Sequence, residues 1–187
     1  MNTTRLLVIG AGAIGRTHID RIQRTPGLAL AGIADPSDAG RALAESLDVP
    51  WAPDHVSALE QFQPQGAIVA TPNRFHAEIG VALLEKGVHV LVEKPIAASV
   101  ADAQRMIDAA KANDRVLMVG QVERFNPAVE TVKRAVADDE IISIQITRVG
   151  PFPPRMGEVG VVIDLAVHDI DIIRHLTDSE IVEVQPQ

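Results

Sequence analysis

The chain has 187 residues, and 47% of them are hydrophobic, which is enough for a buried core in one large or two small domains. Its formal net charge of −8, without any basic run, argues against nucleic acid or an anionic membrane surface as a partner. The absence of cysteine excludes disulfides, thiol nucleophiles and cysteine metal sites, and it agrees with a cytoplasmic location. No apolar run approaches the length of about 18 residues that a membrane span needs.

The first apolar stretch, residues 6–15, reads LLVIGAGAIG and joins a strand-like run to a glycine-rich turn. Its glycines follow the spacing GxGxxG. In this pattern Gly10 allows a tight turn, Gly12 lets a pyrophosphate approach the backbone, and Gly15 lets the next helix pack against the strand. The loop residues expected to contact a cofactor are Gly10, Ala11, Gly12, Ala13, Ile14 and Gly15.

A helix is predicted to begin near Ala13, so that its free backbone N–H groups and positive dipole end face a bound anion. The next apolar run, LALAGIAD, ends in Asp35, which lies 20 residues after Gly15. A carboxylate at this place accepts the ribose hydroxyls of an adenosine and repels a 2′-phosphate. The sequence therefore predicts NAD as the cofactor, with NADP less favoured. The alternative is a buried strand with an ordinary glycine turn and a capping aspartate.

Strands and helices then alternate as far as residue 120. Helices are predicted over residues 38–48, 56–61, 77–86 and 99–114, and further strands over 66–70, 89–95 and 115–120, while 50–53 reads as a loop. This alternation is typical of right-handed crossovers and a parallel sheet. The predicted fold class is α/β, with a doubly wound, Rossmann-type nucleotide-binding domain over residues 1–120.

The pattern changes after residue 120, and residues 121–187 are predicted to begin a second, α+β domain. A helix follows Pro127, residues 140–150 alternate like a strand with one covered face, and a proline-rich loop over 150–160 leads to a helix over 161–176. Residues 180–187 form a further strand candidate. Two isolated strands are too few for a stable sheet, so this domain reads as truncated, with a partial, mostly antiparallel sheet. An exposed half-sheet invites pairing with another chain, so a homo-oligomer is expected.

Four polar residues of the helix over 161–176 form one stripe on an otherwise apolar cylinder: Asp164, His168, Asp171 and His175. An acid/base site and a divalent-metal site are two interpretations of this stripe. The third is a solvated helix face.

Glu93, Lys94 and Pro95 follow directly from the strand that begins at residue 89. Ligands of open parallel sheets bind at the carboxyl ends of the strands, so a lysine here is expected beside the reactive end of the cofactor. The alternative for Lys94 is an ordinary surface lysine. A cis peptide bond before Pro95 is a further possibility that the sequence leaves open.

Taken together, the motifs GAGAIG, AD, ATPNRFHAE, LVEKP, GQVERFNP and VIDLAVHDID resemble those of the glucose-fructose oxidoreductase, inositol dehydrogenase and rhizopine catabolism (Gfo/Idh/MocA) family of NAD(P)-dependent oxidoreductases. They occur in the family's order across essentially the whole chain. The resemblance implies a Rossmann domain followed by a domain with a large open sheet, which often mediates oligomer contacts. Family members continue well beyond residue 187.

The resemblance also implies roles for individual residues. Lys94 corresponds to the family's EKP lysine, His168 to its general base, and Asp164 to the residue that orients this base or the substrate. Residues implied near the cofactor's nicotinamide side are Thr71, Pro72, Asn73, His76, Glu93, Lys94 and Gln121. Asp171 and His175 fall outside the pattern and are expected on the helix surface. No metal is expected.

The implied reaction takes a hydride from a secondary hydroxyl of a sugar to NAD. The segments around residues 123–130 and 148–171 most resemble the subgroup that oxidises the 3-hydroxyl of UDP-linked N-acetylated sugars. A free sugar or inositol is the alternative substrate, and a non-catalytic NAD-binding module is the alternative function.

Overall fold

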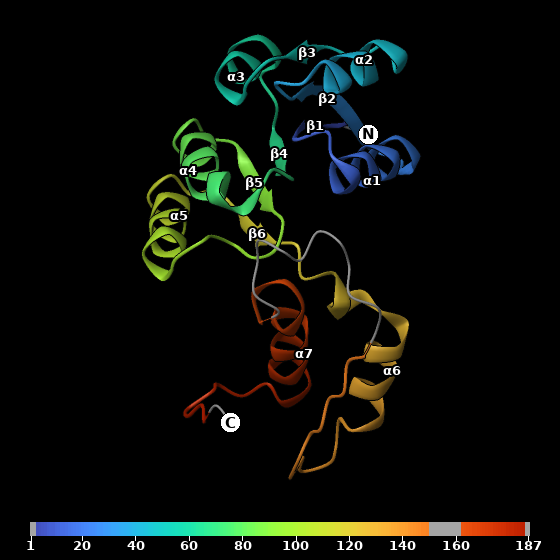
Figure 1. The fold of residues 1–187 in the computed structure, drawn as a ribbon, viewed down its shortest axis with the longest axis vertical. Helices are drawn as coiled ribbons and strands as arrows, with labels where there is room; N and C mark the ends of the chain where they lie inside the picture. The colour runs from blue at the N-terminus through green and yellow to red at the C-terminus, as the bar shows by residue number, and fades with distance from the viewer. Residues whose placement is uncertain (1–2, 150–161, 186–187) are drawn as a thin grey trace. The chain divides into compact units, whose positions relative to one another are not determined.

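The structure is a computed structural model, and it describes residues 3–149 and 162–185. Two compact units make up the chain, Met1–Gly120 and Gln121–Gln187 (Figure 1). Each unit is described below by itself.

The first unit is built on one six-stranded sheet. Its strands are β1 (Thr4–Ile9), β2 (Leu28–Ala34), β3 (Trp51–Ala52), β4 (Gly66–Val69), β5 (His89–Val92) and β6 (Leu117–Val119). Every pairing is parallel, and the order across the sheet is β3-β2-β1-β4-β5-β6. This order reverses between β1 and β4, which creates the crevice where such sheets bind ligands. The predicted α/β Rossmann-type fold is confirmed.

Helices cover both faces of this sheet (Figure 1). They are α1 (Ala13–Arg24), α2 (Asp38–Ser46), α3 (His55–Phe62), α4 (His76–Glu85) and α5 (Val100–Ala112), with a short 3-10 turn, η1 (Asn73–Phe75), before α4. Alternate residues of a strand point to opposite faces. Leu7 and Ile9 accordingly pack in the cluster that includes α3, α4 and α5, whereas Val8 packs in the cluster of α1 and α2.

Side-chain caps fix where several helices begin. Ser37 accepts a hydrogen bond from the Gly40 N–H at the start of α2, and Asp54 accepts one from the Ser57 N–H at the start of α3. Ser99 does the same for α5. Caps of this kind satisfy N–H groups that have no partner within the helix. The caps therefore fix the first turns of the helices that follow β2, β3 and β5.

The structure corrects one detail of the prediction for the first unit. Residues 50–53 were expected to form a loop, but Trp51 and Ala52 pair with Ile33 and Ala34 of β2 as the short edge strand β3. Two residues flanked by prolines at 50 and 53 give no periodicity to detect. Their pairing is set by the neighbouring strand.

The second unit contains a 3-10 turn, η2 (Val122–Phe125), two α-helices, α6 (Pro127–Ala135) and α7 (Val167–Thr177), and a π-helical turn, η4 (Val162–Ala166). Both helices were predicted. In contrast, residues 140–149 and 180–185 form no strand, so the partial antiparallel sheet is not confirmed within the described residues. A strand needs a neighbouring strand to hydrogen-bond its backbone N–H and C=O groups, and an alternating sequence pattern alone does not provide that neighbour. The proline-rich loop lies outside the described residues.

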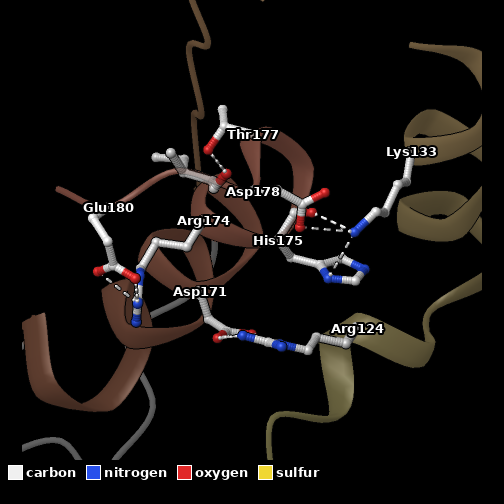
Figure 2. A network of polar contacts seen from close by, with 9 residues as sticks. Arg124, Lys133, Asp171, Arg174, His175, Thr177, Asp178 and Glu180 are labelled. Atoms are coloured by element: carbon white, nitrogen blue, oxygen red, sulfur yellow. Dashed lines mark hydrogen bonds and ion pairs between the residues drawn. The ribbon is translucent and has the colours of Figure 1, made fainter. Parts of the chain in front are cut away.

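A polar network joins η2, α6 and α7 (Figure 2). Arg124 donates two hydrogen bonds to Asp171, at 2.8 and 2.7 Å, and Lys133 donates one to the His175 carbonyl at 2.8 Å. Asp171 is only 8% exposed, so its expected place on the helix surface is wrong. A polar stripe in a sequence does not show whether its side chains are hydrogen-bonded to water or to another side chain. Here Arg124 is that partner, and the hydrogen bonds to Asp171 raise the pKa of Arg124.

Candidate functional site

A cavity of about 910 Å³ lies at the carboxyl edge of the sheet in the first unit. It combines the glycine loop after β1 with the residues that follow β2, β3 and β4. Its lining residues include Gly10, Ala11, Gly12, Ala13, Asp35, Thr71 and Pro72, all of which the sequence predicted as cofactor contacts. The cavity is therefore large enough for a nucleotide and lies at the reversal of strand order, where dinucleotides bind.

The three glycines of the loop differ in what surrounds them. Gly10 has φ of +93°, and a Cβ on it would lie 2.6 Å from the Ala70 carbonyl oxygen. A Cβ on Gly15 would overlap the Gly10 carbonyl oxygen, so this glycine allows α1 to pack against the loop. A Cβ on Gly12 would meet nothing within 4 Å. The space beside Gly12 opens into the cavity, and it fits a pyrophosphate that approaches the start of α1.

Asp35 connects the second strand to this loop. One carboxylate oxygen accepts a hydrogen bond from the Ala11 N–H at 2.7 Å, and the other accepts from the N–H and the hydroxyl of Ser37. Burial raises the pKa of Asp35, but the hydrogen bonds from Ser37 and Ala11 outweigh it, so the pKa lies below the ordinary value. Asp35 is therefore a carboxylate at neutral pH, as recognition of a ribose diol requires.

Gly40 explains how the Asp35 side chain finds room beside α2. A Cβ on Gly40 would lie 2.5 Å from the Asp35 Cβ. The same glycine donates its N–H to the Ser37 hydroxyl at 3.0 Å. Asp35, Ser37 and Gly40 thus form one packed corner at the end of β2.

Several cavity-lining residues were not predicted. They include Arg16, Ser37, Pro53, Asp54, His55, Phe75 and Ile79. Pro53, Asp54 and His55 follow the short strand β3, whose position the sequence did not reveal. The N-cap pattern DHVS, residues 54–57, could have indicated these residues, because Asp54 is the N-cap of α3.

Thr71 supplies a further polar group to the cavity. Its hydroxyl oxygen is buried and has no hydrogen-bond partner in the part of the chain that the structure describes. Buried polar atoms normally have partners, so an unpartnered hydroxyl on the wall of a cavity fits a ligand with a polar edge. Together with the open space at Gly12 and the carboxylate of Asp35, it makes the residues present compatible with a dinucleotide.

Glu93 and Lys94 lie at the end of β5, and both are half-buried. Glu93 accepts a hydrogen bond from His18 of α1, with 2.7 Å between the Glu93 Oε1 and His18 Nε2 atoms. Burial raises the pKa of Glu93, but the hydrogen bond and charge of His18 outweigh this effect and lower it. The Lys94–Pro95 peptide bond is cis, the isomer that the sequence left open.

The remaining predicted residues are placed in both units. His76 begins α4 and is only 1% exposed, with its ring nitrogens 2.9 Å from the Pro95 carbonyl oxygen and 2.8 Å from that of Thr71. Asn73 begins η1, and Ile14 and Gly15 lie in α1. None of these four lines the 910 Å³ cavity, and neither do Glu93 and Lys94.

The other three predicted site residues belong to the second unit. Gln121 is its first residue. His168 lies in the first turn of α7 and is half-buried. Asp164 lies in η4, and its side chain falls outside the described part. Lys94 and His168 thus belong to different units, and their meeting at one substrate hydroxyl stays a prediction. Among the described residues no group of three or more histidines and carboxylates could hold a metal ion.

No helix in the described ranges 3–149 and 162–185 is long and apolar enough to cross a membrane. The family described as "Oxidoreductase family, NAD-binding Rossmann fold" (GFO_IDH_MocA) matches residues 4–121.

Three relatives illustrate the similarity. Inositol 2-dehydrogenase of Corynebacterium glutamicum is 32% identical over 190 residues, which cover 97% of this chain and 56% of that protein. The solved structure of the UDP-N-acetylglucosamine 3-dehydrogenase GnnA of Acidithiobacillus ferrooxidans has a TM-score of 0.84 at 27% identity and covers 98% of this chain and 60% of that one. The WlbA dehydrogenase of Chromobacterium violaceum, solved in complex with NADH and UDP-GlcNAcA, has a TM-score of 0.70 at 25% identity, over 74% of this chain and 41% of that one.

The chain covers little more than half of the first two of these proteins and 41% of the third. The family match nevertheless covers the whole sheet, the glycine loop and Asp35. It agrees with the cavity, whose open space at Gly12 and carboxylate at Asp35 fit NAD. The chain therefore belongs to the Gfo/Idh/MocA family of oxidoreductases with an NAD-binding Rossmann fold.

Proposed function

We propose that this chain carries the cofactor-binding domain and the start of the substrate domain of an NAD-dependent dehydrogenase that oxidises a secondary hydroxyl of a sugar or polyol. The observation that carries the proposal is the 910 Å³ cavity, in which the open space at Gly12 faces the same volume as the Asp35 carboxylate. Asp35 accepts the hydroxyls of the adenosine ribose, and its negative charge disfavours the 2′-phosphate of NADP.

The residues proposed for the chemistry are Lys94, His168 and Asp164. Bound NAD supplies the acceptor for the hydride, so the protein must take the proton of the substrate hydroxyl. His168 is the general base, because a neutral imidazole accepts a proton near neutral pH. Lys94 stabilises the negative charge that develops on the substrate oxygen, and Asp164 orients the imidazole or the substrate.

The proposed substrate is a UDP-linked N-acetylated sugar. The similarity to the UDP-N-acetylglucosamine 3-dehydrogenase of Acidithiobacillus ferrooxidans, 30% identical over 180 residues, supports it. The similarity to inositol 2-dehydrogenase supports a polyol as the second candidate. Both substrates present a ring carbon with a secondary hydroxyl, so the same base and the same cation serve either one.

The test measures NADH formation with UDP-N-acetylglucosamine, free N-acetylglucosamine and myo-inositol, using the unaltered chain and three variants. Lys94→Ala and His168→Ala are expected to abolish turnover while NAD still binds, in Lys94→Ala with a dissociation constant raised about tenfold. Lys86→Ala, at an exposed lysine just after α4, is the matched control and is expected to keep the full rate.

Turnover that survives His168→Ala would remove the proposed base. Binding of NAD without turnover of any of the three compounds by the unaltered chain would instead support a non-catalytic NAD-binding module.

A further inference from the structure

Lys94 lies between two residues that are each hydrogen-bonded to a different histidine. On one side, the Glu93 carboxylate accepts from His18 of α1 at 2.7 Å. On the other, the Pro95 carbonyl oxygen lies 2.9 Å from the Nδ1 atom of His76, which begins α4. The turn formed by Glu93, Lys94 and Pro95 is thus connected to α1 and α4, two helices that begin at the carboxyl edge of the sheet, where the cofactor is proposed to bind.

The contact between His18 and Glu93 is well shielded from water, with the two side chains 20% and 14% exposed. A carboxylate only accepts hydrogen bonds, so the proton must lie on the His18 Nε2 atom. Gly120, at the end of β6, leaves room for this carboxylate, because a Cβ there would lie 3.0 Å from the Glu93 Oε1 atom. The His18 side chain from the middle of α1 and the backbone of Gly120 after β6 therefore both lie against the Glu93 carboxylate.

The His76 ring lies between two turns of the backbone. Its Nε2 atom lies 2.8 Å from the Thr71 carbonyl oxygen after β4, and its Nδ1 atom faces the Pro95 carbonyl oxygen after β5. Both carbonyl oxygens can only accept, so a ring nitrogen of His76 that carries a proton donates to the carbonyl oxygen that faces it. His76 is only 1% exposed, so water does not reach the ring to replace either contact.

The strand order indicates which half of the cofactor lies near these turns. Asp35 directly follows β2, which lies on one side of β1, whereas β4 and β5 lie on the other side of β1. A dinucleotide binds across the reversal between β1 and β4. With its adenosine ribose at Asp35, its nicotinamide half therefore reaches toward the turns after β4 and β5.

We infer that His18 and His76 are positioning residues that fix the Lys94 turn from both sides and so set the place of the lysine ammonium beside the nicotinamide half of NAD. This inference rests on the proposed function for the role of Lys94. Lysine has a long flexible side chain, so the backbone that carries it must be fixed if its charge is to act at one place. Small displacements of a positioned group are costly in catalysis.

The test compares the affinities of NAD and ADP-ribose, which lacks the nicotinamide, by calorimetric titration of the chain. In His18→Leu and His76→Phe, the dissociation constant of NAD is expected to rise about tenfold, equivalent to about 1.4 kcal/mol. That of ADP-ribose is expected to stay unchanged. His18→Gln retains an N–H donor for Glu93 and is expected to restore most of the NAD affinity.

His89→Leu is the matched control, because His89 lies at the opposite end of β5, where its Nδ1 atom accepts from the Val116 N–H at 3.0 Å. It is expected to leave both affinities unchanged. Equal weakening of NAD and ADP-ribose in the His18 and His76 variants, or no weakening of either, would overturn the inference. If His76→Phe fails to fold, the pair His18→Leu and His18→Gln decides the result. Absence of sugar turnover with the expected binding pattern would count against the proposed function alone.

Discussion

Replacing Gly12 with alanine should weaken NAD binding without weakening the fold. Gly12 has φ of −67° and ψ of −170°, an extended conformation that alanine adopts without strain, and its Cβ would meet no protein atom within 4 Å. The expected change in the free energy of unfolding is below about 1 kcal/mol, from the small opposing effects of alanine on helix capping and on unfolded-state entropy. The new methyl group points into the space assigned to the pyrophosphate, so the dissociation constant of NAD should rise by at least about tenfold.

Gly15→Ala provides the contrast within the same loop. Its Cβ would overlap the Gly10 carbonyl oxygen and lie 2.9 Å from the carbonyl carbon, so backbone atoms must move. Overpacking of this kind costs about 1–3 kcal/mol or more. In a chain of this size the cost lowers the unfolding temperature by about 2–4 °C per kcal/mol.

Thermal unfolding without ligand and calorimetric titration with NAD measure the two effects separately. Gly12→Ala should keep the unfolding temperature and lose affinity, whereas Gly15→Ala should unfold at a lower temperature. An NAD affinity of Gly12→Ala equal to that of the unaltered chain would refute the assignment of the pyrophosphate to this space.

Three further predictions follow from packing and charge. Gly40→Ala places a Cβ 2.5 Å from the Asp35 Cβ and should weaken NAD binding by displacing this carboxylate, which titration would detect. Because folding lowers the pKa of Asp35, the carboxylate should contribute its full stability above the ordinary carboxyl pKa of about 4, and this contribution should be lost as the pH falls through the lowered pKa. Unfolding curves of the unaltered chain and of Asp35→Asn, measured at neutral and at acid pH, should therefore differ in unfolding free energy at neutral pH and agree in acid. Arg124→Ala leaves the buried carboxylate of Asp171 without its guanidinium and should cost about 2 kcal/mol, less than a fully buried pair because Arg124 is 42% exposed. Arg174→Ala breaks a pair whose side chains are 43% and 82% exposed, and should cost less than about 1 kcal/mol; equal losses of unfolding free energy in the two arginine variants would contradict this ranking.

The Rossmann-type sheet was predictable because its signals are local. Buried strands such as β1 and β4 are continuous apolar runs, and the helices between them are amphipathic. Gly87, with φ of +77°, follows the end of α4, where glycine commonly terminates a helix. The edge strand β3 has only two residues, so its existence depends on β2 and not on its own sequence. The second unit was harder, because the alternation over residues 140–149 and 180–185 does not show whether a partner strand is present. Self-association through that unit remains a prediction that the particle mass in solution would test.

The candidate site was predictable only in part. Gly10, Gly12 and Asp35 are recognised by their spacing in the sequence. The two glycines shape the loop, and Asp35 accepts a hydrogen bond from it. The partners of His18 and Asp171 were not recognised, because they are Glu93 and Arg124, which are 75 and 47 residues away in the sequence. Contacts of this range are set by the fold and leave no local pattern.

The central claim is that the cavity beside Asp35 binds NAD through its adenosine ribose. Calorimetric titration of the chain with NAD and with NADP tests it most directly. The account predicts that NAD binds at least about tenfold more tightly, since NADP would bring a phosphate against the half-buried carboxylate of Asp35. Equal or tighter binding of NADP would contradict it.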